Sequence, residues 1–244
     1  MKAGARDVLA ADRAIGHVRA IAFDLDGTLI DTAPDLALAA NALLEGLGYP
    51  PLAERQIEAL IGNGIDKLVE GVLIESIDRV AGPVMLADAR AQFRRLYAAR
   101  LFDRSRVYPE VITTLEALVA RGIRLCCVTN KHSAFTLPLL DAAALSRFFA
   151  FALCADRADE RKPNPDLLLA ASARLGVTPS EMLYVGDSPA DIAAAHAAGC
   201  HVAAVDYGYT DRARLAHADP DWIVGSIAEI ATLPAAPRFA NVEV

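Results

Sequence analysis

Two aspartates separated by a single residue are the strongest chemical signal in this chain. Asp24 and Asp26 lie in the stretch FDLDGTLIDT, directly after the apolar run VRAIAF. An apolar run that ends in acids indicates a buried strand that presents carboxylates at its end. Because buried carboxylates without partners are costly, the pattern predicts a site where a metal ion or a basic side chain lies beside these two acids.

Polar residues also follow other strand-like runs of the chain. They are Thr129, Asn130 and Lys131 in VTNK, Lys162 in ERKPNP, and Asp187 and Ser188 in GDSPAD. In an open parallel sheet, ligands bind beyond the carboxyl ends of the strands. We therefore expect separated segments of the sequence to contribute to one site at that edge of the sheet.

Strand-like runs alternate with helical patterns along most of the chain. The expected strands are residues 20–24, 124–129, 149–154, 182–186, 201–205 and 222–224. The helical patterns between them are residues 110–120, 133–140, 165–175 and 190–198. Strands separated by helices of this length form βαβ units. The pattern predicts an α/β fold with a doubly wound, mainly parallel sheet, that is, a Rossmann-like core.

One long segment breaks this alternation. Residues 34–104 show helical periodicity in DLALAANALLEGLG, ERQIEALIG, IDKLVEGVLIE and MLADARAQFRRLYAARLF, with glycines and prolines between them. We therefore predict a discontinuous core, residues 18–33 and 105–233, with an all-helical subdomain inserted at residues 34–104. Residues 1–17 are expected to form a short or frayed N-terminal helical extension, and residues 234–244 a C-terminal tail.

Composition restricts the class of protein. The chain has 244 residues, of which 54% are hydrophobic and 23% charged, and its net charge of −7 argues against a nucleic-acid partner. No apolar stretch reaches the roughly 20 residues of a membrane span, and charges interrupt the N-terminal segment, so we expect neither a membrane partner nor a signal peptide.

The four cysteines, Cys126, Cys127, Cys154 and Cys200, lack metal-type spacing. They predict buried free thiols in a reducing cytoplasm. For the protein as a whole we expect a monomer or a homodimer.

Four motifs, in order along the chain, resemble those of the haloacid dehalogenase-like superfamily of phosphotransferases. They are DLDGTL, VTN, Lys162 in RKPNP, and GDSPAD. Three of them have a plainer explanation by themselves: the acids of the first and fourth motifs could cap helices, and Lys162 could be a solvated loop lysine. Asp191 could be a surface acid, although its i, i+4 spacing from Asp187 would put both on one helix face. The joint occurrence of all four motifs favours a catalytic site.

The resemblance implies a magnesium-dependent phosphatase that works through an aspartyl-phosphate. Asp24 would be the nucleophile, and Asp26 would be the general acid and then the general base. Mg²⁺ would be bound by Asp24, Asp187 and the carbonyl oxygen of Asp26, with Ser188 and Asp191 in its outer sphere. The phosphoryl oxygens would be bound by the Thr28 backbone amide, the Thr129 hydroxyl, the Asn130 amide and Lys162.

The helical insert resembles the small cap that closes over the site in this superfamily. Between two of its helical patterns lies IGNG, so Gly62, Asn63 and Gly64 predict either a substrate loop or a plain turn between helices. Together with AAGC and YGY, the motifs resemble those of enzymes that hydrolyse 2-phosphoglycolate. A small phosphorylated metabolite, 2-phosphoglycolate above all, is therefore the expected substrate.

One departure leaves recognition of the substrate carboxylate open. Glu70 and Gly71 stand where many such enzymes carry an arginine, and Lys67, Arg94 or Arg95 would have to substitute unless these are solvated. The alternatives are another small phosphate ester such as a sugar phosphate or, in a different class, a non-catalytic binding or regulatory module on the same fold. The acids argue against that module and against a dehalogenase, and nothing in the insert supports a phosphoglucomutase.

Overall fold

The centre of the protein is a six-stranded parallel sheet with the strand order β5-β4-β1-β6-β7-β8. The computed structural model describes residues 18–77 and 81–233, so the expected N-terminal extension and C-terminal tail lie outside the described residues. The strands are β1 Ala20–Phe23, β4 Arg124–Thr129, β5 Ala152–Cys154, β6 Met182–Gly186, β7 His201–Val205 and β8 Trp222–Val224. Each expected strand is present, although β5 begins later than predicted.

The chain runs outward from β1 in both directions, which makes the sheet doubly wound as predicted. β4 and β5 lie on one side of β1, whereas β6, β7 and β8 lie on the other. The carboxyl ends of β4, β1 and β6 therefore lie side by side. This is the switch point at which open α/β sheets bind ligands.

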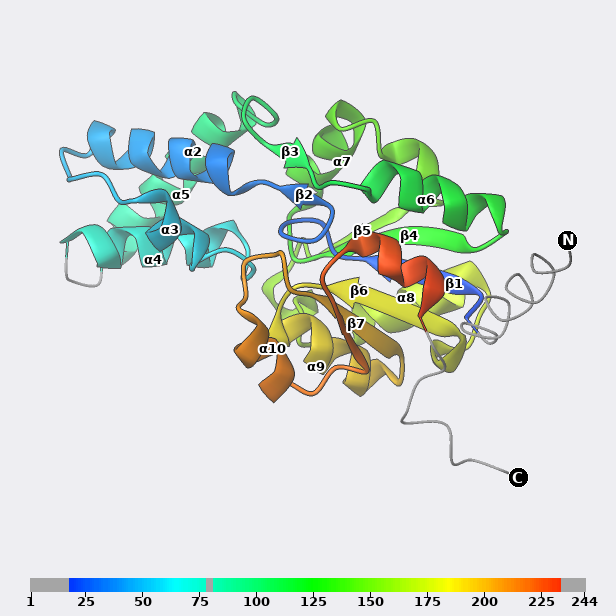
Figure 1. Cartoon of the computed structure of the whole chain (residues 1–244). Coiled ribbons are helices and arrows are strands. Elements are labelled where there is room, and N and C mark those ends of the chain that lie inside the picture. Colours follow the sequence, from blue (N-terminus) through cyan, green and yellow to red (C-terminus); the bar gives the residue numbers. More distant parts are fainter. Residues whose placement is uncertain (1–17, 78–80, 234–244) are drawn as a thin grey trace, which may run out of the picture.

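Helices cover both faces of the sheet (Figure 1). They are α6 Val111–Ala120, α7 Ser133–Ala142, α8 Asp166–Leu175, α9 Pro189–Ala198 and α10 Arg212–His217, with short 3-10 helices at Ser146–Phe148, Ala158–Glu160, Pro179–Glu181 and Ile227–Thr232. In β1, Ile21 and Phe23 join the cluster of α6 and α7, while Ala20 and Ala22 join that of α8 and α9. Both faces of the strand are buried, so its apolar run is continuous.

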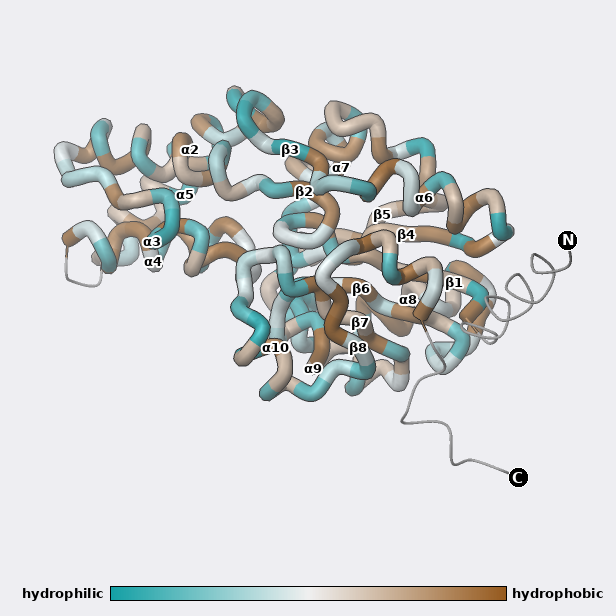
Figure 2. Tube along the Cα trace, in the orientation of Figure 1, coloured by the Kyte–Doolittle hydropathy of each residue, from teal (hydrophilic) through white to brown (hydrophobic). Residues whose placement is uncertain are grey.

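The helical insert lies beside the sheet with a hydrophobic core of its own (Figure 1). Its helices are α2 Ala33–Gly46, α3 Glu54–Glu58, α4 Ile65–Ile77 and α5 Pro83–Ala98. In Figure 2 these helices alternate between hydrophilic and hydrophobic residues, as expected for helices with one buried face. The predicted helices are therefore present, and the subdomain boundaries at residues 33/34 and 104/105 remain a prediction.

The chain leaves and re-enters the core through a pair of two-residue strands that the sequence did not predict. β2 Ile30–Asp31 pairs antiparallel with β3 Arg106–Val107. Next to them the buried Asp35 accepts hydrogen bonds from the backbone N–H of Arg104 and of Ser105, both at 2.9 Å. Strands this short carry no periodic signal, so only the fold reveals the paired connection.

The cysteines are free, as predicted, but they are not all buried. Cys126, Cys127 and Cys200 are buried, whereas Cys154 is partly exposed at the end of an outer strand. Burial raises the pKa of Cys126 and of Cys200 to about 12, so both remain neutral thiols. Among the described helices, none combines the length and hydropathy needed to cross a membrane.

Candidate active site

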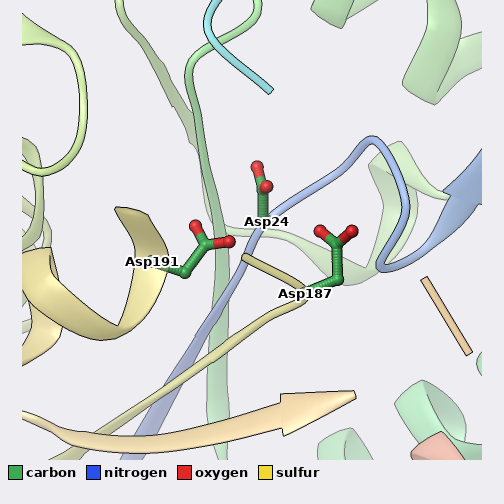
Figure 3. Close-up of side chains that lie close together, drawn as sticks. All are labelled: Asp24, Asp187 and Asp191. Carbon is green, nitrogen blue, oxygen red and sulfur yellow. The ribbon is translucent and has the colours of Figure 1, made fainter. Parts of the chain in front are cut away.

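Three buried aspartates meet at the switch point of the sheet. Asp24 follows β1, Asp187 follows β6, and Asp191 lies in the first turn of α9. Their carboxyl groups lie close together (Figure 3), and each contributes an oxygen atom within 4.8 Å of the others. The structure thus brings together the acids of two predicted motifs.

Glycines make room for the carboxyl group of Asp187. Gly27 has a φ of +80°, and a Cβ at this position would lie 2.4 Å from Asp187 Oδ2. A Cβ at Gly208 would lie 2.4 Å from the Cβ of Asp187. No side chain fits at either position without moving the acid, so the two loops are shaped around this carboxylate.

Lys162 is the cation that balances these acids, and it is not a solvated lysine. Its ammonium donates hydrogen bonds to Asp191 Oδ1 at 2.6 Å and to the Tyr184 hydroxyl at 2.7 Å, and it lies 2.9 Å from Asp24 Oδ1. Burial lowers the pKa of Lys162, but Asp191 and Asp24 outweigh this effect and hold the pKa above its usual value. The lysine therefore stays charged in the buried site.

The cluster holds more negative than positive charge. Burial raises the pKa of Asp24 to about 6, although Lys162 opposes the shift, and Asp191 adds to it. Burial, and then the nearby Asp191 and Asp24, raise the pKa of Asp187 well above its ordinary value. Among the described residues, Asp24 Oδ1 finds no hydrogen-bond donor of suitable geometry, because Lys162 meets it only as an ion pair. A buried oxygen in this situation fits a metal ligand.

The remaining acid, Asp191, has both oxygens occupied by protein donors. Oδ1 accepts hydrogen bonds from Lys162 and from the Tyr184 hydroxyl, and Oδ2 accepts from the backbone N–H and the hydroxyl of Ser188. The expectation that Asp187 and Asp191 share a helix face is wrong, because α9 begins at Pro189 with Ser188 as its N-cap. Asp187 lies in the preceding loop, and the turn of that loop brings the two acids together.

Asp26 lies on a different side of the site and meets a second buried lysine. Its Oδ1 accepts hydrogen bonds from the Thr32 hydroxyl at 2.7 Å and from the Lys131 ammonium at 2.9 Å. Burial lowers the pKa of Lys131, but Asp26 and Tyr97 reverse the shift and raise it above its usual value. The sequence placed Lys131 among the polar residues at the strand ends but gave it no role, although it directly follows the VTN motif.

The predicted phosphate ligands already have partners within the protein. The Asn130 side chain donates hydrogen bonds to the carbonyl oxygen of Gly62 at 2.9 Å and of Lys162 at 3.3 Å. It also accepts one from the Lys162 N–H at 2.8 Å. The Asn130 side chain therefore joins the insert to the core.

Two other predicted phosphate ligands also have partners within the core. The Thr28 N–H donates to the Leu25 carbonyl at 3.3 Å, and the Thr129 hydroxyl accepts from the Lys131 N–H at 3.2 Å.

The insert loop with Gly62, Asn63 and Gly64 borders the site. A cavity of about 310 Å³ lies between Asn63 and the Asp24 and Asp187 loops. A smaller chamber of about 30 Å³ lies on the side of Asp26 and Lys131. The described lining of both includes Asp24, Asp26 and Gly62.

The three basic residues suggested as substitutes for the missing arginine do not line either space in the part of the chain that the structure describes. Lys67 pairs with Glu70 at 2.9 Å, Arg94 pairs with Asp66 at 2.6 Å, and Arg95 is exposed. Their charges are satisfied on the surface of the insert or by solvent. Of the two alternatives left open by the sequence, the structure therefore favours solvated side chains over substitutes for the arginine.

Tyr209, from the YGY stretch, connects the Asp187 loop to the start of the insert. Its N–H donates to Asp187 Oδ2 at 2.9 Å. Its hydroxyl accepts hydrogen bonds from the N–H of Thr32 at 2.7 Å and of Ala33 at 3.0 Å, and it donates to Asp31 at 3.0 Å. Tyr209 therefore links an acid of the site to the point where α2 begins.

Comparison with known proteins identifies the class to which this fold and this site belong. The family model of haloacid dehalogenase-like hydrolases matches residues 21–205, and the chain belongs to this family. It is 45% identical over 216 residues to a protein of Nitrosospira multiformis named phosphoglycolate phosphatase, covering 88% of this chain and 95% of that one. A protein of Neisseria meningitidis with the same name is 43% identical over 220 residues, covering 89% and 94%.

A solved structure shares the fold of this chain. It is the crystal structure of a predicted phosphoglycolate phosphatase from Haemophilus somnus, with a TM-score of 0.83 and 36% identity. The match covers 88% of this chain and 96% of that one. The superfamily resemblance expected from the sequence motifs is therefore confirmed over most of the chain.

Proposed function

We propose that this protein is a magnesium-dependent phosphatase that hydrolyses 2-phosphoglycolate to glycolate and phosphate through an aspartyl-phosphate. The coarser prediction, an enzyme that hydrolyses phosphoric monoesters, is confirmed by the family match and by relatives named phosphoglycolate phosphatase. The observation that carries the metal-dependent mechanism is the buried cluster of Asp24, Asp187 and Asp191 around the ammonium of Lys162. The choice of 2-phosphoglycolate is supported by the names of the relatives.

The donor set of the cluster suits Mg²⁺, which prefers oxygen ligands. Asp24 and Asp187 would hold it together with the carbonyl oxygen of Asp26, while Asp191 and Ser188 would stay in its outer sphere. Asp191 is not expected to bind the ion directly, because both of its oxygens already accept hydrogen bonds from the protein. When bound, Mg²⁺ neutralises charge on the phosphoryl group and on the attacking carboxylate.

The protein residues then perform two displacements at phosphorus. In the first, an oxygen of Asp24 forms a bond to phosphorus as the bond from phosphorus to the ester oxygen breaks, and Asp26 gives its proton to that oxygen. In the second, Asp26 takes a proton from water, whose oxygen bonds to phosphorus and releases the Asp24 carboxylate and phosphate. Lys162 would stabilise negative charge on the phosphoryl oxygens in both steps.

Removal of divalent metal provides the test of this proposal. After exhaustive chelation we expect hydrolysis of 2-phosphoglycolate to fall by about 10²-fold, since metal stabilisation of a transition state is worth several kcal/mol. Added Mg²⁺ should restore the rate. Release of inorganic phosphate is the measurement, with para-nitrophenyl phosphate as a second substrate. An undiminished rate after chelation would rule out a metal requirement. Faster hydrolysis of a sugar phosphate than of 2-phosphoglycolate would show that 2-phosphoglycolate is not the preferred substrate.

The insert loop gives a further prediction. Gly64 has a φ of +79°, and a Cβ there would lie 3.0 Å from the guanidinium carbon of the core residue Arg161. We expect Gly64→Val to lower turnover of 2-phosphoglycolate by about tenfold and to affect para-nitrophenyl phosphate less, because the small substrate depends more on closure of the insert. Steady-state kinetics on both esters checks this.

Gly48→Val is the matched control for the loop variant. Gly48 also belongs to the insert and has a φ of +74°, but a Cβ there meets nothing within 4 Å. It therefore carries the same backbone strain away from the core. If Gly48→Val and Gly64→Val lowered turnover of both esters alike, the loop would have no part in substrate selection.

A further inference from the structure

Lys131 is a buried cation for which the proposed reaction has no assigned use. Its side chain is 3% exposed, and its ammonium contacts both oxygens of Asp26, at 2.9 and 3.1 Å. The ammonium also lies 4.8 Å from the centre of the Tyr97 ring, which α5 contributes from the insert. A lysine held on one side by an acid of the core and on the other by an aromatic ring of the insert has a defined position.

This lysine lines the small chamber of about 30 Å³ between the core and the insert. Leu36, Ile61, Ile65 and Leu68 form the apolar part of its wall. Within the described lining, Lys131 is the single basic residue. A space of this size holds about two water-sized groups, which suits the carboxylate end of a two-carbon substrate better than a sugar ring.

The two ends of 2-phosphoglycolate differ in what they require. The phosphoryl end would meet Asp24 and Lys162, whereas the carboxylate end needs a separate cation. A carboxylate placed against apolar walls without a partner is costly, but one that accepts a charge-assisted hydrogen bond there is bound strongly. Asp24 and Asp26 line the same chamber as Lys131. A short substrate over Asp24 can therefore reach Lys131.

We propose that Lys131 binds the carboxylate of the substrate and so selects a small anionic ester. This inference rests on the proposed function, since it names the group that reads the proposed substrate. When the substrate binds, the ammonium donates one of its hydrogen bonds to the substrate carboxylate and no longer to Asp26. Asp26 keeps its hydrogen bond from the Thr32 hydroxyl, so the acid stays in place while the lysine serves the substrate.

The test compares two esters of similar length, 2-phosphoglycolate and 2-hydroxyethyl phosphate, which lacks the carboxylate. In Lys131→Met we expect kcat/KM for 2-phosphoglycolate to fall about 10²-fold more than kcat/KM for 2-hydroxyethyl phosphate, mainly through KM. Lys131→Arg keeps the charge and should retain most of the preference. Lys131→Gln keeps a donor for Asp26, so it tests the charge if Lys131→Met fails to fold.

Thr32→Val is the matched control, because it removes the other side-chain hydrogen bond to Asp26 and leaves Lys131 intact. It should lower kcat/KM for both esters by a similar factor. If the Met and Gln variants also lost activity equally on both esters, Lys131 would act only through Asp26 and the inference would be overturned. If the wild-type enzyme itself did not prefer 2-phosphoglycolate, the proposed substrate would be wrong, which is a separate result.

Discussion

Replacement of Asp24 by asparagine is expected to lower turnover by about 10⁴-fold or more, the scale of loss seen when a covalent nucleophile is removed. The amide cannot attack phosphorus, so no phosphoenzyme should form. Rapid-quench experiments that trap acid-stable, hydroxylamine-sensitive phosphate on the protein measure this directly. Asp141→Asn, at an exposed aspartate in α7, is a control that should leave the phosphoenzyme intact. Phosphoenzyme in the Asp24→Asn variant would show that the nucleophile is misassigned.

The same variant has a stability signature that separates lost chemistry from lost folding. The pKa of Asp24 is about 6 in the folded protein, against an ordinary value of 3.8. A carboxyl pKa raised by folding means that stability declines as pH rises from about 3.8 through about 6. At pH 8 the neutral amide removes this cost. Metal-free Asp24→Asn should therefore unfold at a temperature no lower than that of the metal-free wild type.

Replacement of Asp26 by asparagine is expected to slow hydrolysis of 2-phosphoglycolate, the proposed substrate, by about 10²–10⁴-fold, the usual value of general acid–base catalysis. The amide oxygen can still accept hydrogen bonds from Thr32 and Lys131, so the loop should keep its shape. Because the backbone carbonyl remains, the variant should still bind Mg²⁺, which titration calorimetry would detect. The defect is therefore expected in proton transfer alone.

The leaving group distinguishes this role of Asp26 from a structural one. Para-nitrophenolate departs without protonation, so Asp26→Asn should slow formation of the phosphoenzyme from para-nitrophenyl phosphate much less than from 2-phosphoglycolate. Single-turnover rates on the two esters measure the difference. A native rate on 2-phosphoglycolate would exclude Asp26 as the acid, and equal losses in this first step would point to a defect in binding or loop geometry.

The contact between the insert and the core unites the proposals on substrate selection. Asn130, from the core, donates a hydrogen bond to the Gly62 carbonyl, and Arg161 packs against Gly64. These contacts place the wall of the small chamber over the carboxyl ends of the strands. Shape on the insert side and charge from Lys131 on the core side would then act together on the same short substrate.

Much of the core could be predicted from the sequence because its signals are local. A parallel strand buried on both faces is a continuous apolar run, and a helix between two such strands has a 3.6-residue period. These rules located each strand of the sheet, the helices α6 to α9 and the four helices of the insert. The polar residues at the strand ends likewise located Asp24, Lys162 and Asp187, because parallel strands end at one edge.

What the sequence could not determine depends on contacts between groups that are distant along the chain, or on local turns that carry no periodic signal. Lys131 and Asp26 are separated by 105 residues, and neither residue type predicts a contact with the other. Asp187 and Asp191 meet through a loop and not through a helix face, and β2 and β3 are too short to show a period. Burial of a charged side chain is costly unless an opposite charge lies beside it. Only the tertiary structure decides which lysine is buried beside an acid and which, like Lys67, pairs at the surface of the insert.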